Sequence, residues 1–568
     1  MKAAETPLRR GCAPFRPLIL LFAALVTASA LAQVVPDAGR ILQETQQLNQ
    51  PRPAAPTPLP PIQAPAPAKP PPAAAGDVKV NVTNFTFTGN EAVSTEALQA
   101  AVAQWSNRAL DFGQLMQVVE AIEARYKAEG YFLAQAYLPP QKIKDGAIEI
   151  AVAEGKLGET RLEGESRVDP EVVFKYLDRL PKGKAVTLPT VERQILLINE
   201  LAGGRAALDL QAGEAQGSTD IVLTQTPEVP LTGRLEASNH GSPSTGEKRV
   251  GLSLNGNSPL NLGDKISANL LTTDSKNLAS YSLRYELPVG GDGLRLIASS
   301  SLAEYALGGG LAALGASGQA LSMRLGASYP ILRSRAANLK LQVEGDMSKL
   351  SDRFNATNLD MGKRSRGLTA TVSGDSLDEF MGGGSNRFDL VLRHGELSFG
   401  PTSAALDEPP AGPGTAGGFN KVNITASRQQ TIDAKLSVQL QLSYQLAFKN
   451  LDSSEKLAFG GPTSMPGYAN GEASGDAGGQ VKLNLRWQMN NEIALTVFAN
   501  YARLRLAYEP LATATVNHKR LSDRGLIIDW TAAGGYSASV ILGWAGMDAP
   551  NPLDNARPRV WFNLAYAW

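Results

Sequence analysis

The chain has 568 residues, which is enough for several domains. Its 54 basic and 54 acidic residues leave no net charge, so the composition offers no basic surface for nucleic acid. The one cysteine, Cys12, falls in a predicted signal peptide, so we expect neither disulfides nor a thiol nucleophile in the mature chain.

Residues 1–32 have the pattern of a secretory signal peptide. Basic residues open the segment, residues 18–26 form an apolar core, and Ala30-Leu31-Ala32 supplies the small residues that signal peptidase requires. A membrane-anchor helix is the alternative, but the apolar run is too short for a stable span. No other run reaches the length of a membrane helix, so an integral protein would cross the membrane by strands.

Residues 33–50 come next, and 36–49 favour a short helix with Asp37 as its N-cap. Residues 51–76 form a Pro/Ala-rich linker, in which 11 of the 22 residues 51–72 are proline. A stiff, extended chain of that length spans roughly 68 Å at about 3.1 Å per residue. Because this exceeds the thickness of a bilayer, the helix can lie far from the next domain, as a plug inside a pore.

Two small α+β modules are predicted after the linker. Residues 77–156 read strand, helix, helix, strand, strand, with apolar residues at helical spacing from Leu115 to Tyr126. Residues 157–228 repeat this order more weakly. The sequence lacks a glycine-rich loop followed by Lys-Ser/Thr, so we expect no nucleotide cofactor.

Residues 229–568 contain about sixteen segments that alternate apolar and polar residues. The clearest has apolar side chains at every second position from Leu436 to Phe448, which is long enough to cross a bilayer when tilted. The last segment places Val560, Phe562, Leu564, Tyr566 and Trp568 on one face. Such strands in series predict α+β modules followed by an all-β transmembrane barrel of about 16 antiparallel strands.

Four groups of residues together resemble the outer-membrane transporters of two-partner secretion, the filamentous-hemagglutinin and hemolysin secretion/activation family. The first group includes Tyr126, Gly130, Tyr131, Pro139, Gln141, Glu154 and Gly155. The others are Asn239-His240-Gly241-Ser242, Asn261-Leu262-Gly263-Asp264, and Leu457 to Pro462 continuing through Gly467-Tyr468 and Gly475-Asp476. Their order and spacing are more specific than any single motif.

The resemblance implies two POTRA modules, residues 77–156 and 157–228, in the periplasm below a barrel in the bacterial outer membrane. It implies export of one large, unfolded partner protein that the POTRA modules recognise, and an adhesin, a hemolysin and a contact-dependent toxin are all open as cargo. Outer-membrane lipids and the barrel-assembly machinery are further expected partners, nucleic acid is not, and no enzymatic activity is implied.

Two other functions are compatible with a barrel of this kind. A barrel-assembly or insertase factor of the same superfamily often has more POTRA modules and lacks the helix with its proline-rich tether. A passive porin or receptor would not need the modules.

The resemblance also implies an in-folded loop, residues 449–478, between strands eleven and twelve. Its tip normally carries Arg in a V-R-G-Y/F motif, but here it reads Met465-Pro466-Gly467-Tyr468. The partner motif F-x-D on strand thirteen reads Phe498-Ala499-Asn500, and alternation turns Phe498 and Asn500 toward the lumen. Because both charges are missing together, we expect the tip to dock through packing and neutral hydrogen bonds, with Tyr468 and Asn500 as contacts. The alternative is that this chain does not use the contact between loop tip and strand thirteen, or that it has lost export activity.

Three smaller features complete the sequence-based expectations. Trp568, the final residue, is expected to mark the chain for barrel assembly, by analogy with outer-membrane barrels generally. His240, His394 and His518 are scattered, so no metal site is expected. The lumenal Lys482 either lines an export path or is generic polar lining.

Overall fold

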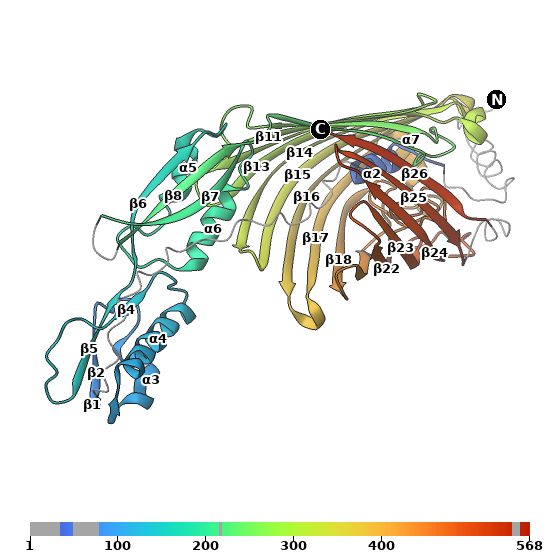
Figure 1. The fold of residues 1–568 in the computed structure, drawn as a ribbon. Helices are drawn as coiled ribbons and strands as arrows, with labels where there is room; N and C mark the ends of the chain where they lie inside the picture. The colour runs from blue at the N-terminus through green and yellow to red at the C-terminus, as the bar shows by residue number, and fades with distance from the viewer. Residues whose placement is uncertain (1–34, 49–78, 215–217, 548–556) are drawn as a thin grey trace, which may run out of the picture.

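The computed structural model describes residues 35–48, 79–214, 218–547 and 557–568. The predicted signal peptide and the proline-rich linker lie outside the described residues. Two α/β modules extend from one end of a wide barrel, and helix α2 (Ala38–Leu48) lies inside the barrel (Figure 1). None of the helices that the structure describes is long and apolar enough to cross a membrane.

The first module packs two helices against a three-stranded sheet. Its elements are β1 (Val80–Val82), β2 (Asn84–Thr88), α3 (Thr95–Val102), β3 (Arg108–Leu110), α4 (Phe112–Ala128), β4 (Gln135–Tyr137) and β5 (Ala147–Ala153). The sheet order is β2-β5-β4, with β2 parallel to β5. Helix α4 begins at a reciprocal capping box between Asp111 and Gln114, and its buried face is the one that the apolar spacing predicted.

The second module repeats this arrangement. Its elements are β6 (Lys156–Gly164), α5 (Pro170–Leu177), α6 (Leu188–Ile198), β7 (Gly204–Ala212) and β8 (Ser218–Pro227). The sheet order is β6-β8-β7, again with one parallel and one antiparallel pair. Both modules have the predicted order of elements, apart from the additional short β1–β3 pair in the first.

Ion pairs fix the second module to one end of the barrel. Arg193 of α6 lies 3.1 Å from Asp292, and Glu200 lies 2.6 Å from Arg333. Burial opposes ionisation of Asp292, but hydrogen bonds from Tyr329 and Arg193 outweigh it and hold the pKa of this carboxyl below its usual value. The contacts define a module end and an opposite end of the barrel.

Sixteen antiparallel strands close the barrel within the part of the chain that the structure describes. They are β9 (Leu231–Ser238), β10 (Arg249–Asn257), β11 (Lys265–Thr273), β12 (Leu278–Val289), β13 (Leu294–Ala306), β14 (Ala316–Arg333), β15 (Ala337–Phe354), β16 (Leu359–Asp378), β17 (Gly384–Phe399), β18 (Gly417–Thr431), β19 (Leu436–Ala447), β22 (Ala477–Gln488), β23 (Ile493–Arg505), β24 (His518–Thr531), β25 (Tyr536–Ala545) and β26 (Arg559–Ala567). The predicted fold class is confirmed.

The two ends of the barrel differ in their connections. Those at the module end are short turns, whereas the opposite end carries longer loops, which hold the small elements. These are η2 (Gly309–Leu314), η3 (Asn355–Thr357), α7 (Pro401–Asp407), β20 (Leu457–Phe459) and β21 (Ala473–Gly475). The remaining short turns of helix are η1 (Ala103–Trp105) in the first module and η4 (Phe380–Gly382) at the module end.

Candidate functional site in the barrel lumen

Helix α2 occupies the lumen and packs its apolar face on the barrel wall. Ala38, Ile41 and Leu42 are only 0, 2 and 5% exposed. The backbone N–H of Ala38 donates to the Asp352 carboxylate at 2.7 Å, and the Tyr305 hydroxyl donates to the same oxygen at 2.5 Å. A carboxylate at a helix N-terminus is favourable because the free amides there carry partial positive charge.

The polar face of α2 makes charged and amide contacts with other strands. Glu44 lies 2.5 Å from Arg249 on β10, and Arg324 on β14 donates to the Gln46 side chain at 2.6 Å. The helix therefore contacts the wall through its polar face as well as its apolar face, and it lies in the lumen, as the plug hypothesis requires (Figure 1).

Lys363 on β16 joins the helix to the in-folded loop. Its Nζ lies 2.9 Å from Asp37 and 2.8 Å from Asp452, and it donates to the Ser453 hydroxyl at 3.0 Å. The lysine side chain is only 9% exposed. Removing one partner from a buried ion pair leaves an uncompensated charge, so this lysine couples helix, loop and wall.

The loop formed by residues 449–478 folds into the barrel, where β20 pairs with β21. At its tip, Met465 and Tyr468 are fully buried and pack against Ala502, Leu521 and Ala545 of the wall. The tip therefore fills the lumen beside β23 to β25 instead of extending outward.

Three hydrogen bonds hold the main chain of the tip and the wall beneath it. The N–H of Gly467 donates to Asp523 Oδ2 at 2.8 Å, and Asn500 Nδ2 donates to Asp523 Oδ1 at 2.8 Å. Trp561 Nε1 on β26 donates to the Pro466 carbonyl oxygen at 2.8 Å. Phe498 packs beneath the tip with Trp561.

The expectation of a wholly neutral contact between Tyr468 and Asn500 is wrong. A carboxylate is present on the next strand, at Asp523 of β24. The Asn500 side chain donates its hydrogen bond to this carboxylate and not to the loop tip. The Tyr468 hydroxyl instead donates to the Ser522 and Met547 carbonyl oxygens. The missed signal was alternation on β24, which turns Asp523 inward, together with the Asn500–Asp523 register.

Lys482 continues the same row across the wall. It is the cross-strand partner of Asn500, and its Nζ donates to the Thr463 carbonyl oxygen at 2.5 Å. Gln480 on the same strand donates to the Ser464 carbonyl oxygen at 2.9 Å. In this structure Lys482 therefore holds the loop instead of lining an open path.

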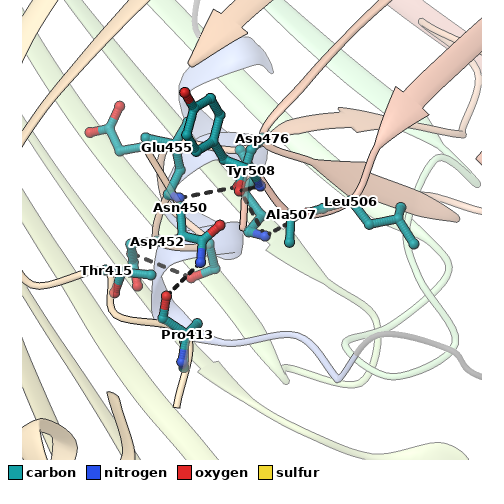
Figure 2. A network of polar contacts seen from close by, with 12 residues as sticks. Pro413, Thr415, Asn450, Asp452, Glu455, Asp476, Leu506, Ala507 and Tyr508 are labelled. Atoms are coloured by element: carbon teal, nitrogen blue, oxygen red, sulfur yellow. Dashed lines mark hydrogen bonds and ion pairs between the residues drawn. The ribbon is translucent and has the colours of Figure 1, made fainter. Parts of the chain in front are cut away.

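Asn450 joins the base of the loop to two neighbouring loops (Figure 2). Its Nδ2 donates to the Pro413 and Glu509 carbonyl oxygens at 2.6 and 2.9 Å, and its Oδ1 accepts from the Glu509 N–H at 2.8 Å. Pro413 belongs to the loop before β18, and Glu509 to the loop before β24. One side chain therefore connects three loops at the end opposite the modules.

Asp476, in the Gly475-Asp476 motif, closes the other side of that base (Figure 2). It is completely buried, pairs with Lys456 at 3.0 Å, and accepts from the N–H groups of Tyr508 and Leu451 at 2.7 and 3.1 Å. The loop is thus anchored at its tip, at its base and against α2.

A polar cavity of about 610 Å³ remains between the end of α2 and the wall formed by β9 to β14. Serine and asparagine side chains of β10 to β14 line it, including Ser253, Asn255, Ser267, Asn269, Ser282 and Ser322. Across the described ranges, no group of three or more His, Cys, Asp and Glu side chains is arranged to hold a metal ion.

The family residues of the first module meet one another inside it. The Tyr126 hydroxyl donates to Glu154 at 2.8 Å, and Glu154 also accepts from the Ala92 N–H at 2.7 Å. Burial and the Glu154 carboxylate raise the pKa of the Tyr126 phenol well above its usual value. Tyr131 packs its ring edge-on at 6.1 Å from Tyr126.

The remaining family residues shape the turns and the joint between the modules. Gln141 exchanges two 2.8 Å hydrogen bonds with the Glu149 backbone and also contacts the Pro139 carbonyl oxygen. The Gly130 carbonyl oxygen accepts from the Leu188 N–H at 2.9 Å, at the start of α6. Gly155 has φ +68°, and a Cβ there would lie 2.4 Å from Leu133 Cβ. These residues maintain the fold and do not converge on a pocket.

Trp568 lies in the seam where the barrel closes. Its N–H donates to the Gly233 carbonyl oxygen at 3.0 Å, and Gly233 returns a hydrogen bond at 3.1 Å. Its ring stacks on Tyr566 with centroids 5.8 Å apart. The C-terminal residue is therefore part of the wall.

Two family matches cover most of the described chain. Residues 217–510 match the family described as Haemolysin secretion/activation protein ShlB/FhaC/HecB, and residues 80–155 match the POTRA domain, ShlB-type. The chain is 22% identical over 494 residues to the Heme/hemopexin transporter protein HuxB of Haemophilus influenzae, with 84% of each covered. It is 24% identical over 417 residues to the Outer membrane transporter CdiB of Escherichia coli, with 72% of this chain and 69% of the relative covered.

Solved structures show the same fold. CdiB from Escherichia coli aligns with a TM-score of 0.71 at 20% identity, over 94% of this chain and 100% of that one. CdiB from Acinetobacter baumannii aligns with a TM-score of 0.62 at 15% identity, again over 94% and 100%. The first module is thus a periplasmic POTRA domain, and the end of the barrel opposite the modules faces the cell exterior. The chain belongs to the haemolysin secretion/activation family of outer-membrane transporters.

Proposed function

We propose that this transporter exports one large partner protein in unfolded form, as in two-partner secretion, and that it is not an enzyme. One observation carries the proposal. A polar lumen leads from modules with edge strands, and it is closed by two elements that are each bonded to the wall, α2 and the in-folded loop. The transporters HuxB and CdiB, the first named for heme/hemopexin, support a transport role.

Recognition is proposed to use the sheet edges of the POTRA domains. Strands β2 and β4 are the edges of the first sheet, and β6 and β7 are those of the second. An edge strand can capture an extended segment through backbone hydrogen bonds, which tolerates many sequences and suits an unfolded client. At nine residues each, β6 and β7 are the longest edge strands in the modules, and residues 182–185 already pair with the first two residues of β6.

Export is proposed to begin along the wall that faces the polar cavity. Serine, asparagine and glutamine side chains are the most numerous there and can form neutral hydrogen bonds with a passing chain, and arginine, lysine and glutamate side chains lie among them. A sixteen-stranded barrel is wide enough for an extended chain only after α2 leaves. The hydrogen bonds of α2 to Asp352 and its ion pairs are therefore what the cargo must displace.

Deletion of the gene, followed by a survey of secreted proteins, tests the proposal. We expect the loss of one large secreted protein and its return when the intact gene is restored. Loss of many outer-membrane proteins would instead support an assembly factor and overturn the export proposal.

Single cysteines test recognition at the edges. The only natural cysteine lies in the predicted signal peptide, so an introduced one is expected to be unique in the mature chain. We expect Thr86→Cys on β2 or Gln211→Cys on β7 to cross-link to arrested cargo. Glu120→Cys and Glu171→Cys, exposed on helices of the same modules, are the controls. Equal cross-linking from helices and edges would contradict edge recognition.

A further inference from the structure

Lys349 and Arg364 lie side by side on the outer face of the barrel. They are cross-strand partners on β15 and β16, and both are exposed. The adjacent Lys363 binds Asp37 inside the lumen, so strand alternation turns Arg364 outward. Like charges directly opposite each other destabilise a strand pair. Among the described residues neither cation has an acidic partner. An anion that is not part of the chain would therefore relieve the repulsion between the two positive charges.

The two cations lie at the extracellular border of the lipid-facing surface. Arg333 at the end of β14 and Arg335 in the turn before β15 contact the second module and mark the periplasmic side. Beyond them the outward positions of β15 are apolar up to Met347, which is 63% exposed, and Lys349 follows. Polar residues directly beyond the apolar band lie at the level of the lipid headgroups.

Arg366 extends this group, and we name Lys349, Arg364 and Arg366 the outer cationic patch. Arg366 is the cross-strand partner of Met347 and lies 2.6 Å from Glu396. Glu396 neutralises Arg366 alone, so the patch keeps the positive charges of the other two residues.

An apolar groove adjoins the patch on the membrane side. It has a volume of about 840 Å³, and its lining includes Met323, Leu325, Met347 and Leu368 together with Arg366 and its partner Glu396. Leu325 and Leu368 are 70 and 55% exposed, as side chains in contact with lipid are. At Gly345, in the groove, the nearest atom to an added Cβ lies 3.9 Å away, so its lack of a side chain leaves the space open.

We propose that groove and patch together bind one acylated, phosphorylated sugar lipid, the lipopolysaccharide of the outer leaflet. An acyl chain occupies the groove, and a phosphate lies on Lys349 and Arg364. Both side chains are favoured phosphate ligands, and only an amphiphile matches an apolar groove that ends at cations at headgroup level. This site faces the membrane and does not depend on what the lumen exports.

The test uses the full-length protein in detergent and counts bound lipid by native mass spectrometry. The probes are lipid A with its phosphates and the same lipid A after dephosphorylation. We expect K349Q/R364Q to bind phosphorylated lipid A about ten- to thirtyfold more weakly, since each headgroup cation contributes about 1 kcal/mol. The unaltered protein should likewise bind dephosphorylated lipid A about ten- to thirtyfold more weakly than phosphorylated lipid A.

Controls separate the site from general charge and folding effects. R353Q/D360N removes an arginine of β15 whose charge Asp360 of β16 already neutralises at 2.8 Å, and this variant should bind as the unaltered protein does. G345L fills the groove and should weaken both lipids. Heat-dependent electrophoretic mobility confirms that each barrel is folded. Unchanged affinity in K349Q/R364Q, equal binding of both lipids, or equal loss in the control overturns the proposal.

Discussion

The backbone N–H of Gly467 donates a 2.8 Å hydrogen bond to the carboxylate of Asp523, so the loop tip is held by its main chain on an acidic residue of the wall. The resemblance to two-partner-secretion transporters implies a different pair, an Arg side chain on the loop with an Asp on strand thirteen. Here Pro466 offers only its carbonyl oxygen, to Trp561, and Asn500 orients the displaced carboxylate. An acidic residue therefore still holds the loop tip, but it lies on β24, one strand after the strand that the resemblance implies.

Replacing Asp523 by alanine should release the loop tip. The Gly467 N–H and the Asn500 amide would lose their acceptor, and a buried unsatisfied donor costs about 1–3 kcal/mol. We expect residues 462–471 to become accessible to protease added to intact cells, together with reduced export. P466A is the control, because only the backbone oxygen at that position is used. Equal protection in D523A and the unaltered protein would show that the tip does not depend on this carboxylate.

Moving the acid back to strand thirteen is a sharper test. N500D alone would place a second carboxylate where an amide now donates to Asp523 at 2.8 Å, and two buried like charges repel. We expect N500D to lose loop protection and N500D/D523N to regain it, since an amide and a carboxylate again face each other. A tolerated N500D, or a double variant no better than the single one, would contradict this arrangement.

The period-two pattern predicted the barrel because each strand has one face in lipid and one in the lumen. The strand at Leu436 and the inward direction of Asn500 both follow from that local rule. The contact of Asp523 with the loop tip could not be predicted from the sequence, because it depends on the register between β23 and β24. The contacts of Lys363 could not be predicted either, since Asp37 and Asp452 lie 326 and 89 residues away in sequence. Contacts of this kind are set by tertiary structure.

Replacing Lys363 by glutamine should loosen the plug. Asp37 and Asp452 would then face each other without their shared cation, and breaking a buried ion pair costs about 3–5 kcal/mol. We expect larger and more frequent channel openings in planar bilayers and greater sensitivity of cells to bulky antibiotics. K435Q, which removes an exposed cation beside a periplasmic turn, should behave as the unaltered protein does. Unchanged conductance in K363Q would separate this lysine from the closed state.

Replacing Gly233 by valine should disturb closure of the barrel. A Cβ at this position would lie 2.1 Å from the Trp568 ring, so the ring would have to leave the seam. If Trp568 also marks the chain for barrel assembly, as the sequence predicts, the assembly machinery must recognise it before its ring packs on Gly233. We expect G233V to accumulate as unfolded, heat-unmodifiable protein. G251A, where an added Cβ meets its nearest atom at 3.7 Å, is the control and should assemble.

Asp476 and Asn450 should act as one joint at the base of the loop. D476N would leave Lys456 without its partner and give the Tyr508 or Leu451 N–H a poorer acceptor, at a cost of about 1–3 kcal/mol. N450A would free the two neighbouring loops. We expect each variant to raise conductance and lower export while the barrel still folds.

The double variant decides whether these two side chains work together. If both hold the same base, N450A/D476N should cost clearly less than the sum of the single changes, because the first change already releases what the second would release. E408Q, in the adjoining loop and exposed, is the matched control for loss of a carboxylate at this end. Additive effects would mean two independent contacts, and the in-folded loop would then be fixed mainly at its tip on Asp523 and at Lys363.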